Sequence, residues 1–183
     1  MFDRKHWGNR SEPPPADDAP AWIAGAVPDG WFTATPEVVV DRDEILIVGS
    51  LPVPTLDAEV NEAERAAAER GRISTFREET RDRRIRVAQQ IEHRYRRKVS
   101  WGVVCGGTRE LFTTHSAPVM TRLRQPERQV LDTLVAAGVA RSRSEALAWC
   151  VRLVGEHTDQ WLTDLRAAMG AVDELRRRGP DAA

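Results

Sequence analysis

The chain has 183 residues and a net charge of −1, which is long enough for one domain with a core or for two small ones. No stretch approaches the ~20 consecutive apolar residues of a membrane-spanning helix, and the charged N-terminus lacks the apolar segment of a secretory signal. We therefore expect a cytoplasmic protein that binds no membrane. The charge is unevenly spread: residues 1–71 carry −8, residues 72–98 carry +6 and residues 99–183 carry +1. A cationic segment of this kind raises the local concentration of anions.

The first segment, residues 1–30, is rich in proline, glycine, alanine and aspartate and shows no periodicity. Such a composition buries too little apolar surface to offset the entropy of ordering, so we predict a disordered arm. An alternative remains open. The stretch "PAWIAGAVPDGWF" carries Trp22 and Trp31 and could dock on a protein partner or on the core of the chain itself.

Residues 31–115 show the pattern of a small α+β unit. Apolar β-branched runs predict a hairpin over 37–49 and a second over 98–114, where Gly106 and Gly107 suit a tight turn. A weaker helix is expected at 57–70. The spacing of Thr75 and Glu78 matches a capping box and predicts that a long basic helix begins there. Its arginines either pair with nearby carboxylates or form a phosphate-binding patch; the candidates are Arg83, Arg84, Arg86, Arg94 and Arg97.

Residues 116–156 read as one short strand followed by two helices. The alternation in "VMTRLR" places Val119, Thr121 and Leu123 on one face and Met120, Arg122 and Arg124 on the other. The first helix has Pro126 in its first turn, an apolar stripe of Leu131, Leu134 and Val135, and a stop at Gly138. The second opens with the capping box Ser142-Arg143-Ser144-Glu145. A lone strand leaves its backbone unpaired, so the segment calls for a second copy of the chain.

The strand, the two helices and the "SRSEAL" turn together resemble the ribbon-helix-helix family of dimeric transcriptional regulators and antitoxins. The resemblance implies that two strands pair into a ribbon that enters the DNA major groove, and that the start of the second helix holds a backbone phosphate. The residues that would face the bases are Pro118, Met120 and Arg122. The resemblance assigns the remaining DNA contacts to Arg124, Arg141, Ser142, Arg143 and Ser144.

The last segment, residues 157–183, predicts a C-terminal helix with Trp161, Leu165, Met169 and Val172 at helical spacing. We expect it to pack on the dimer or on the α+β unit. Cys105 and Cys150 lie in apolar surroundings and are expected to be buried thiols. The four histidines lack the spacing of metal ligands, and no phosphate-binding glycine loop is found, so no metal, no cofactor and no enzymatic activity are predicted.

The fold class expected from the whole sequence is α+β: a two-hairpin sheet with a basic helix, a ribbon-helix-helix-like dimerisation segment and a C-terminal helix. The expected function is that of a homodimer that binds duplex DNA on the nucleoid, as a transcriptional regulator. The alternative is a structural or adaptor protein whose ribbon-helix-helix segment only dimerises and whose α+β unit binds another protein. Pro118 and Met120 favour the alternative, because neither side chain has a strong hydrogen-bonding group for a base edge.

Overall fold

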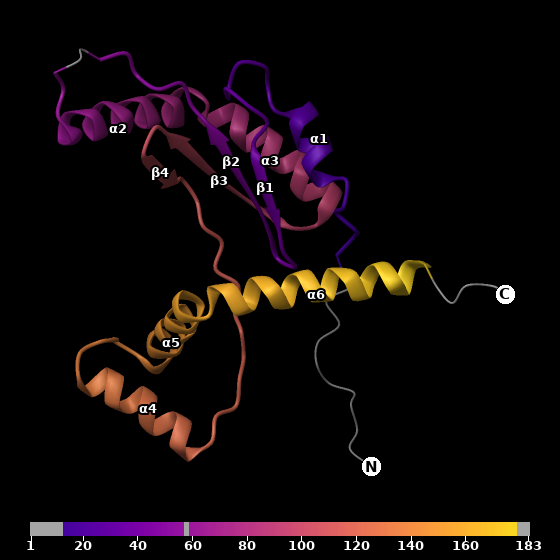
Figure 1. Ribbon diagram of the computed structural model, residues 1–183, viewed down its shortest axis with the longest axis vertical. Helices are drawn as coiled ribbons and strands as arrows, with labels where there is room; N and C mark the ends of the chain where they lie inside the picture. The colour runs from indigo at the N-terminus through magenta and orange to yellow at the C-terminus, as the bar shows by residue number, and fades with distance from the viewer. Residues whose placement is uncertain (1–12, 57–58, 179–183) are drawn as a thin grey trace. The chain divides into compact units, whose positions relative to one another are not determined.

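The computed structural model describes residues 13–56 and 59–178, and its contacts divide the chain after Pro118 (Figure 1). We call residues 1–118 unit 1 and residues 119–183 unit 2, and each is described by itself. Within the described ranges, no helix is both long and apolar enough to cross a membrane.

Unit 1 is built on a four-stranded sheet with the order β1-β2-β3-β4. Its strands are β1 (Glu37–Val40), β2 (Glu44–Ser50), β3 (Lys98–Cys105) and β4 (Thr108–Leu111). The pairs β1–β2 and β3–β4 are antiparallel, which confirms both predicted hairpins, while β2 and β3 run parallel. The second hairpin turns at Gly106, whose φ of +57° is left-handed and favours glycine. The α+β class is thus confirmed.

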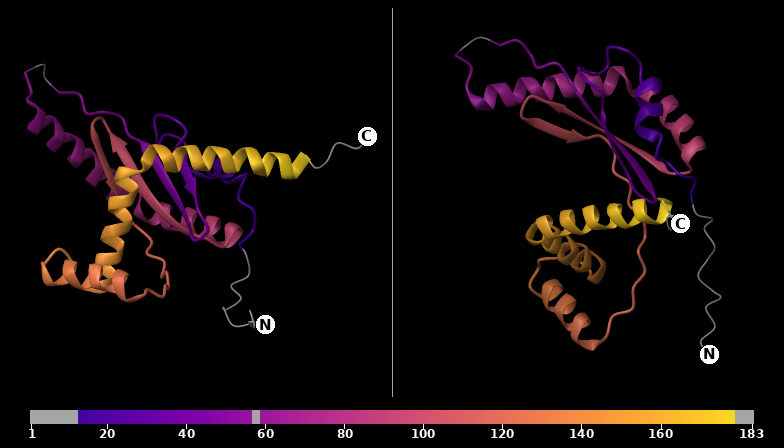
Figure 2. Two further views of the ribbon diagram at one scale, coloured as in Figure 1. Left: turned by 60° about the horizontal axis from the view of Figure 1, so that its bottom comes forward. Right: turned by 45° about the vertical axis from the view of Figure 1, so that its right-hand side comes forward.

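Three helices lie along the sheet of unit 1 (Figure 2): α1 (Ala19–Ala26), α2 (Glu62–Glu79) and α3 (Arg81–Tyr95). The helices α2 and α3 both pack against β3, and α1 contacts α3 and β1. Alternate residues of the central strands, including Ile45, Ile47 and Val103, point into the same core as Ile73 and Ile91 of the helices. A parallel connection through two helices places the central strands side by side although about fifty residues separate them.

The predicted start of the basic helix at Thr75 is wrong. Helix α2 begins after Asn61, whose side chain accepts from the Glu64 backbone N–H while the Glu64 carboxylate accepts from the Asn61 N–H. Thr75 lies inside α2, and its hydroxyl donates to the Gly71 carbonyl. The helical segment then breaks at Thr80, between α2 and α3. Fully buried Ile73 explains why the helix extends through Thr75, since it anchors this part of α2 in the core.

The prediction of a disordered arm over 1–30 is also wrong where the structure describes it. Residues 19–26 form α1, and Ile23 and Trp31 are buried in the core of unit 1. The ring of Trp31 makes edge-on contacts with Phe76 and Trp101. The open alternative, docking on the chain's own core, is therefore correct for this stretch, because its few large apolar side chains gather in one place. Residues 1–12 of the predicted arm lie outside the described residues.

A polar clamp fixes the start of α1 to the end of α3. The two carboxylate oxygens of Asp18 accept from Arg94 Nη2 at 2.7 Å and from the Tyr95 hydroxyl at 3.0 Å. The Arg94 guanidinium also lies over the rings of Trp22 and Tyr95. The hydrogen bond from Arg94 is the main reason that the pKa of Asp18 is lowered from its usual 3.8.

Replacing Asp18 with asparagine should destabilise unit 1 at neutral pH. A lowered folded pKa means that the carboxylate stabilises the fold above its unfolded pKa, and that this contribution is lost as the pH falls through the folded value. The gap between the urea midpoints of the wild type and Asp18→Asn should therefore narrow below pH 3.8. The neighbouring exposed carboxylate of Asp17 offers the control Asp17→Asn. An equal loss in both variants at neutral pH would show that the clamp contributes nothing specific.

Unit 2 contains three helices: α4 (Gln125–Ala136), α5 (Arg143–His157) and α6 (Asp159–Arg178). Its core is small, with only Leu131, Ala140 and Ala146 buried among its described residues. Pro126 lies in the first turn of α4, and Gly138 follows its end with a φ of +74°, as predicted. The thiol of Cys105 is buried as expected, whereas Cys150 of α5 is only half-buried.

The strand expected over 119–124 is not formed in the single chain. Residues 113–124 have no regular strand or helix, and the side chains of Val119 and Met120 are 87% and 79% exposed. A six-residue strand needs a neighbouring backbone for its hydrogen bonds, and no described strand of the chain pairs with it.

Candidate nucleic-acid interface

The residues predicted to contact DNA gather on unit 2, at the start of α5 and along the extended segment before α4. Ser142 is the N-cap of α5, and its hydroxyl accepts from the Glu145 backbone N–H at 3.2 Å. The Glu145 carboxylate accepts in turn from the Arg141 N–H at 2.8 Å, so the predicted capping arrangement is present one residue wider than expected. The first turn of α5 is held in this way with its backbone N–H groups at the surface.

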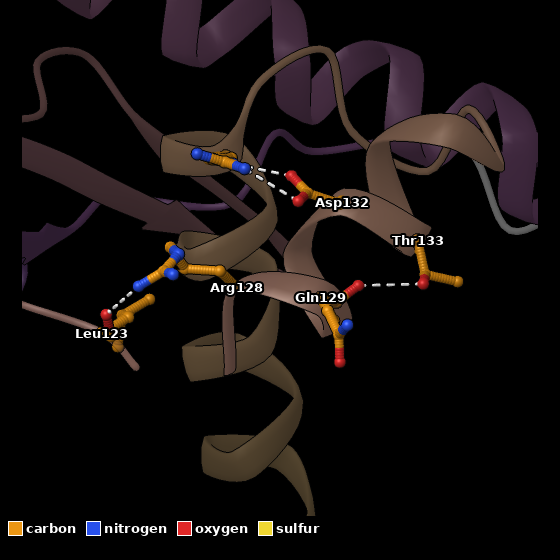
Figure 3. Close-up of polar contacts among 6 residues, drawn as sticks. Leu123, Arg128, Gln129, Asp132 and Thr133 are labelled. Carbon is orange, nitrogen blue, oxygen red and sulfur yellow. Dashed lines mark hydrogen bonds and ion pairs between the residues drawn. The ribbon is translucent and has the colours of Figure 1, made fainter. Parts of the chain in front are cut away.

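The side chain of Arg143 is not free to bind a phosphate in the single chain. Its guanidinium donates to both carboxylate oxygens of Asp132 on α4, from Nε at 2.6 Å and from Nη2 at 2.7 Å (Figure 3). This hydrogen bonding lowers the pKa of the Asp132 carboxyl and raises that of Arg143. The two-pronged pair links α4 to the start of α5, so in the single chain the side chain of Arg143 holds the two helices together.

The extended segment is fastened to α4 by a second arginine. Nη1 of Arg128 donates to the Leu123 carbonyl at 2.7 Å, and Figure 3 shows this contact beside Asp132. Leu123 itself packs against the core of unit 2. Neither Arg128 nor Asp132 was identified from the sequence. The 11-residue separation of Asp132 and Arg143 exceeds the range of helical pairing, so no local pattern announced this contact.

Three predicted arginines are exposed without a side-chain partner among the contacts of the described chain: Arg122, Arg124 and Arg141. Arg122 and Arg124 lie on the extended segment, and Arg141 directly precedes the cap of α5. Met120 and Ser144 are exposed as well. Unit 2 thus presents unpaired cations on the extended segment and directly before the cap of α5, groups that suit a phosphate backbone.

The second predicted patch, on α3, is largely used by the fold. Arg84 is buried, donates to the Thr80 hydroxyl and the Arg77 carbonyl, and lies over the Phe112 ring. Burial lowers its pKa. Arg94 belongs to the Asp18 clamp, and Arg97 donates to the carbonyls of Asp41, Pro14 and Tyr95. Arg83, Arg86 and Arg94 are exposed, but Arg94 is already bound to Asp18, so tertiary contacts use three of the five predicted arginines, and a phosphate-binding patch here stays a prediction.

No group of three His, Cys, Asp or Glu side chains that could hold a metal ion occurs among the described residues.

The buried carboxylate of Glu69 in unit 1 accepts from the Thr108 hydroxyl at 2.6 Å and from the Gly107 N–H at 3.4 Å. These contacts, with that of Thr108 as the largest cause, lower the pKa of Glu69. Glu69 therefore fixes the turn between β3 and β4.

Two family models match the chain, one on each unit. Residues 17–111 match the model described as the Rv1265-like protein, N-terminal domain, and residues 124–176 match the Mb1296 C-terminal domain. The segment between them, 112–123, contains the division of the structure after Pro118. Neither description mentions a ribbon-helix-helix fold, so that resemblance stays a prediction.

Closely similar curated proteins come from two mycobacteria. The uncharacterized protein Mb1296 of Mycobacterium bovis is 58% identical over 180 residues, covering 98% of this chain and 78% of the relative. The uncharacterized protein Rv1265 of Mycobacterium tuberculosis gives the same values. No solved structure matches the chain. With a family model over residues 17–111 and relatives of this identity along nearly its whole length, the chain belongs to the Rv1265-like protein family.

Proposed function

We propose that the protein is a homodimer that binds duplex DNA through unit 2, as a transcriptional regulator on the nucleoid. The observation that carries the proposal is the incomplete state of unit 2 in a single chain. Unit 2 combines an extended segment without a strand partner, a core of three buried residues and three exposed arginines without a side-chain partner, Arg122, Arg124 and Arg141. A second copy would supply the missing strand and deepen the core, as in the ribbon-helix-helix arrangement.

Apolar exposure on the helices supports this dimer. Val130 on α4 is 55% exposed, and Val151 and Val154 on α5 are 64% and 55% exposed. Val151 and Val154 continue the apolar face that Ala146 and Leu147 begin on α5. Burying such a face against a second copy is favourable by about 25 cal/mol per Å² of apolar surface.

DNA contact in this proposal is assigned to Arg122 and Arg124 of the ribbon and to Arg141 with the backbone N–H groups of Arg143 and Ser144. These groups recognise phosphate oxygens, which carry no base sequence. Met120 and Pro118 would face the base edges without polar groups, so recognition through backbone and shape is favoured over direct readout.

Replacing Arg122 or Arg141 with alanine should weaken binding to a fluorescent duplex. Each change removes one phosphate contact from each protomer. The negative slope of log K against log salt should therefore become less steep by about 2 for the dimer. Fluorescence anisotropy titrations at several salt concentrations measure both quantities. Arg152→Ala is the matched control, because Arg152 is an exposed arginine of α5 that lies well beyond its first turn.

Equal losses in all three variants would show that binding follows total charge and not the assigned face. A dimer that does not bind duplex DNA at low salt would contradict the proposal and favour the adaptor function. The adaptor alternative draws support from the use of Arg84, Arg94 and Arg143 in internal contacts, which leaves fewer cations for DNA than the sequence alone suggested.

A further inference from the structure

Helix α6 carries an uncovered apolar stripe. Its members are Trp161, Leu165, Met169 and Val172, which are 61%, 43%, 60% and 46% exposed. The helix has 20 residues and follows α5 directly after Thr158. A tryptophan and three large aliphatic side chains in one exposed row are costly in water, and such a row marks an interaction surface.

The spacing of the apolar residues on α6 is that of a two-helix seam. Three residues of the stripe, Trp161, Leu165 and Val172, follow one another together with Ala168 at steps of four, three and four residues, and Met169 lies next to Ala168 at the edge of this row. This is the alternation of the a and d positions of a heptad, which forms a narrow stripe that fits the same stripe on another helix. The opposite side of α6, at Thr163 and Ala167, is made of small or polar residues. The pattern therefore favours a helix as the occupant of the stripe.

The charges along α6 favour its own copy in the reverse direction. In the last turn Arg177 already pairs with Glu174 at 3.1 Å, and Arg178 follows it, so a parallel pair would bring the two Arg178 guanidinium groups together at one end. An antiparallel pair separates them. With the d position of Ala168 beside the a position of Val172 of the second copy, Asp164 lies opposite Arg178 of that copy, and the same contact occurs twice by symmetry.

We propose that α6 pairs in antiparallel orientation with α6 of a second copy of this chain, through the stripe and two Asp164–Arg178 contacts. The proposal goes beyond DNA binding and does not need the ribbon. It holds whether the two helices belong to the same ribbon-paired dimer or join two such dimers.

Disulfide cross-linking between two copies tests the antiparallel orientation of the paired α6 helices. In the proposed register Ala171 lies beside Ala171 of the second copy, at the edge of the seam, whereas Ala167 points away from it. The full-length Ala171→Cys variant should therefore form disulfide-linked dimers under mild copper-phenanthroline oxidation, resolved on a non-reducing gel. Ala167→Cys is the matched control, since both positions are exposed alanines of α6. The wild type, with the same two native cysteines, supplies the background.

Adding Leu165→Lys to Ala171→Cys should reduce the linked dimer at least severalfold, because it places a lysine in the seam. Adding Thr163→Lys, on the far side of α6, should leave it unchanged. Val119→Lys should disrupt the proposed ribbon. If Ala171→Cys still forms linked dimers when Val119→Lys is added, the α6 pairing is supported independently of the ribbon. Equal linkage of both cysteine variants, or linkage of neither, would overturn the proposal. In the latter case the stripe is covered by something else, such as unit 1, another protein or a lipid surface.

Discussion

Val119→Lys should convert the ribbon dimer into monomers or weaken it at least about a hundredfold. In the single chain the side chain of Val119 is 87% exposed, so a lysine there costs nothing in folding of the monomer. In the proposed ribbon, Val119 turns into the shared core. Two unpaired ammonium groups would then be buried in each dimer, at a cost of about 3 kcal/mol or more, and each 1.4 kcal/mol is a factor of ten in affinity.

The neighbouring residue provides the control. Met120 is 79% exposed in the single chain and lies on the opposite face of the predicted strand. Met120→Lys should therefore keep the dimer and strengthen DNA binding by adding a cation to the outer face. Because α6 can hold copies together, the masses are best measured by analytical ultracentrifugation with Leu165→Lys present in every sample. Dissociation by both lysines, or by neither, would contradict the alternation on which the ribbon rests.

Ile91→Ala should destabilise unit 1 by about 2–5 kcal/mol. The side chain of Ile91 on α3 is fully buried in the core cluster with Ile45, Ile47 and Trp101. Removing three carbons there loses their transfer energy and leaves a cavity that the rigid sheet cannot close. Urea unfolding followed by tryptophan fluorescence measures the change, since Trp31 and Trp101 lie in the same cluster.

The control for Ile91→Ala lies on the same helix. Ile85 is 43% exposed, so Ile85→Ala should change the free energy of unfolding by less than about 1 kcal/mol. The comparison holds the residue type and the helix constant and varies only burial. Similar losses in the two variants would mean that α3 is not seated on the sheet as described.

The elements with strong periodic patterns were predicted from the sequence. Both hairpins formed where β-branched runs flank turn residues, and α4 and α5 formed between their Pro126, Gly138 and Ser142 signals. These signals act within a few residues and need no distant partner. The misplaced helix start shows their limit. The spacing of Thr75 and Glu78 matches a cap, but Asn61 offers one earlier and the burial of Ile73 carries the helix past it.

The site was predicted in part. Ser142 is the cap of α5, and Arg122, Arg124 and Arg141 remain exposed as the resemblance implied. The fate of the other arginines depends on neighbours far along the chain. Arg94 meets Asp18 across 76 residues, and Arg143 meets Asp132 across 11. The sequence does not distinguish an arginine that binds a carboxylate from one that faces water. The role of each arginine therefore depends on the residues packed around it.

By itself the sequence determined the α+β class, the two hairpins and the paired helices of unit 2. Each of these follows from local periodicity, caps and turn residues. Only the tertiary structure decided that residues 19–31 belong to the core, that Arg84, Arg94 and Arg143 are bound internally, and that the α6 stripe is exposed. The physical reason is that burial and ion pairing depend on contacts between segments that are distant in the chain, and local sequence patterns do not show those contacts.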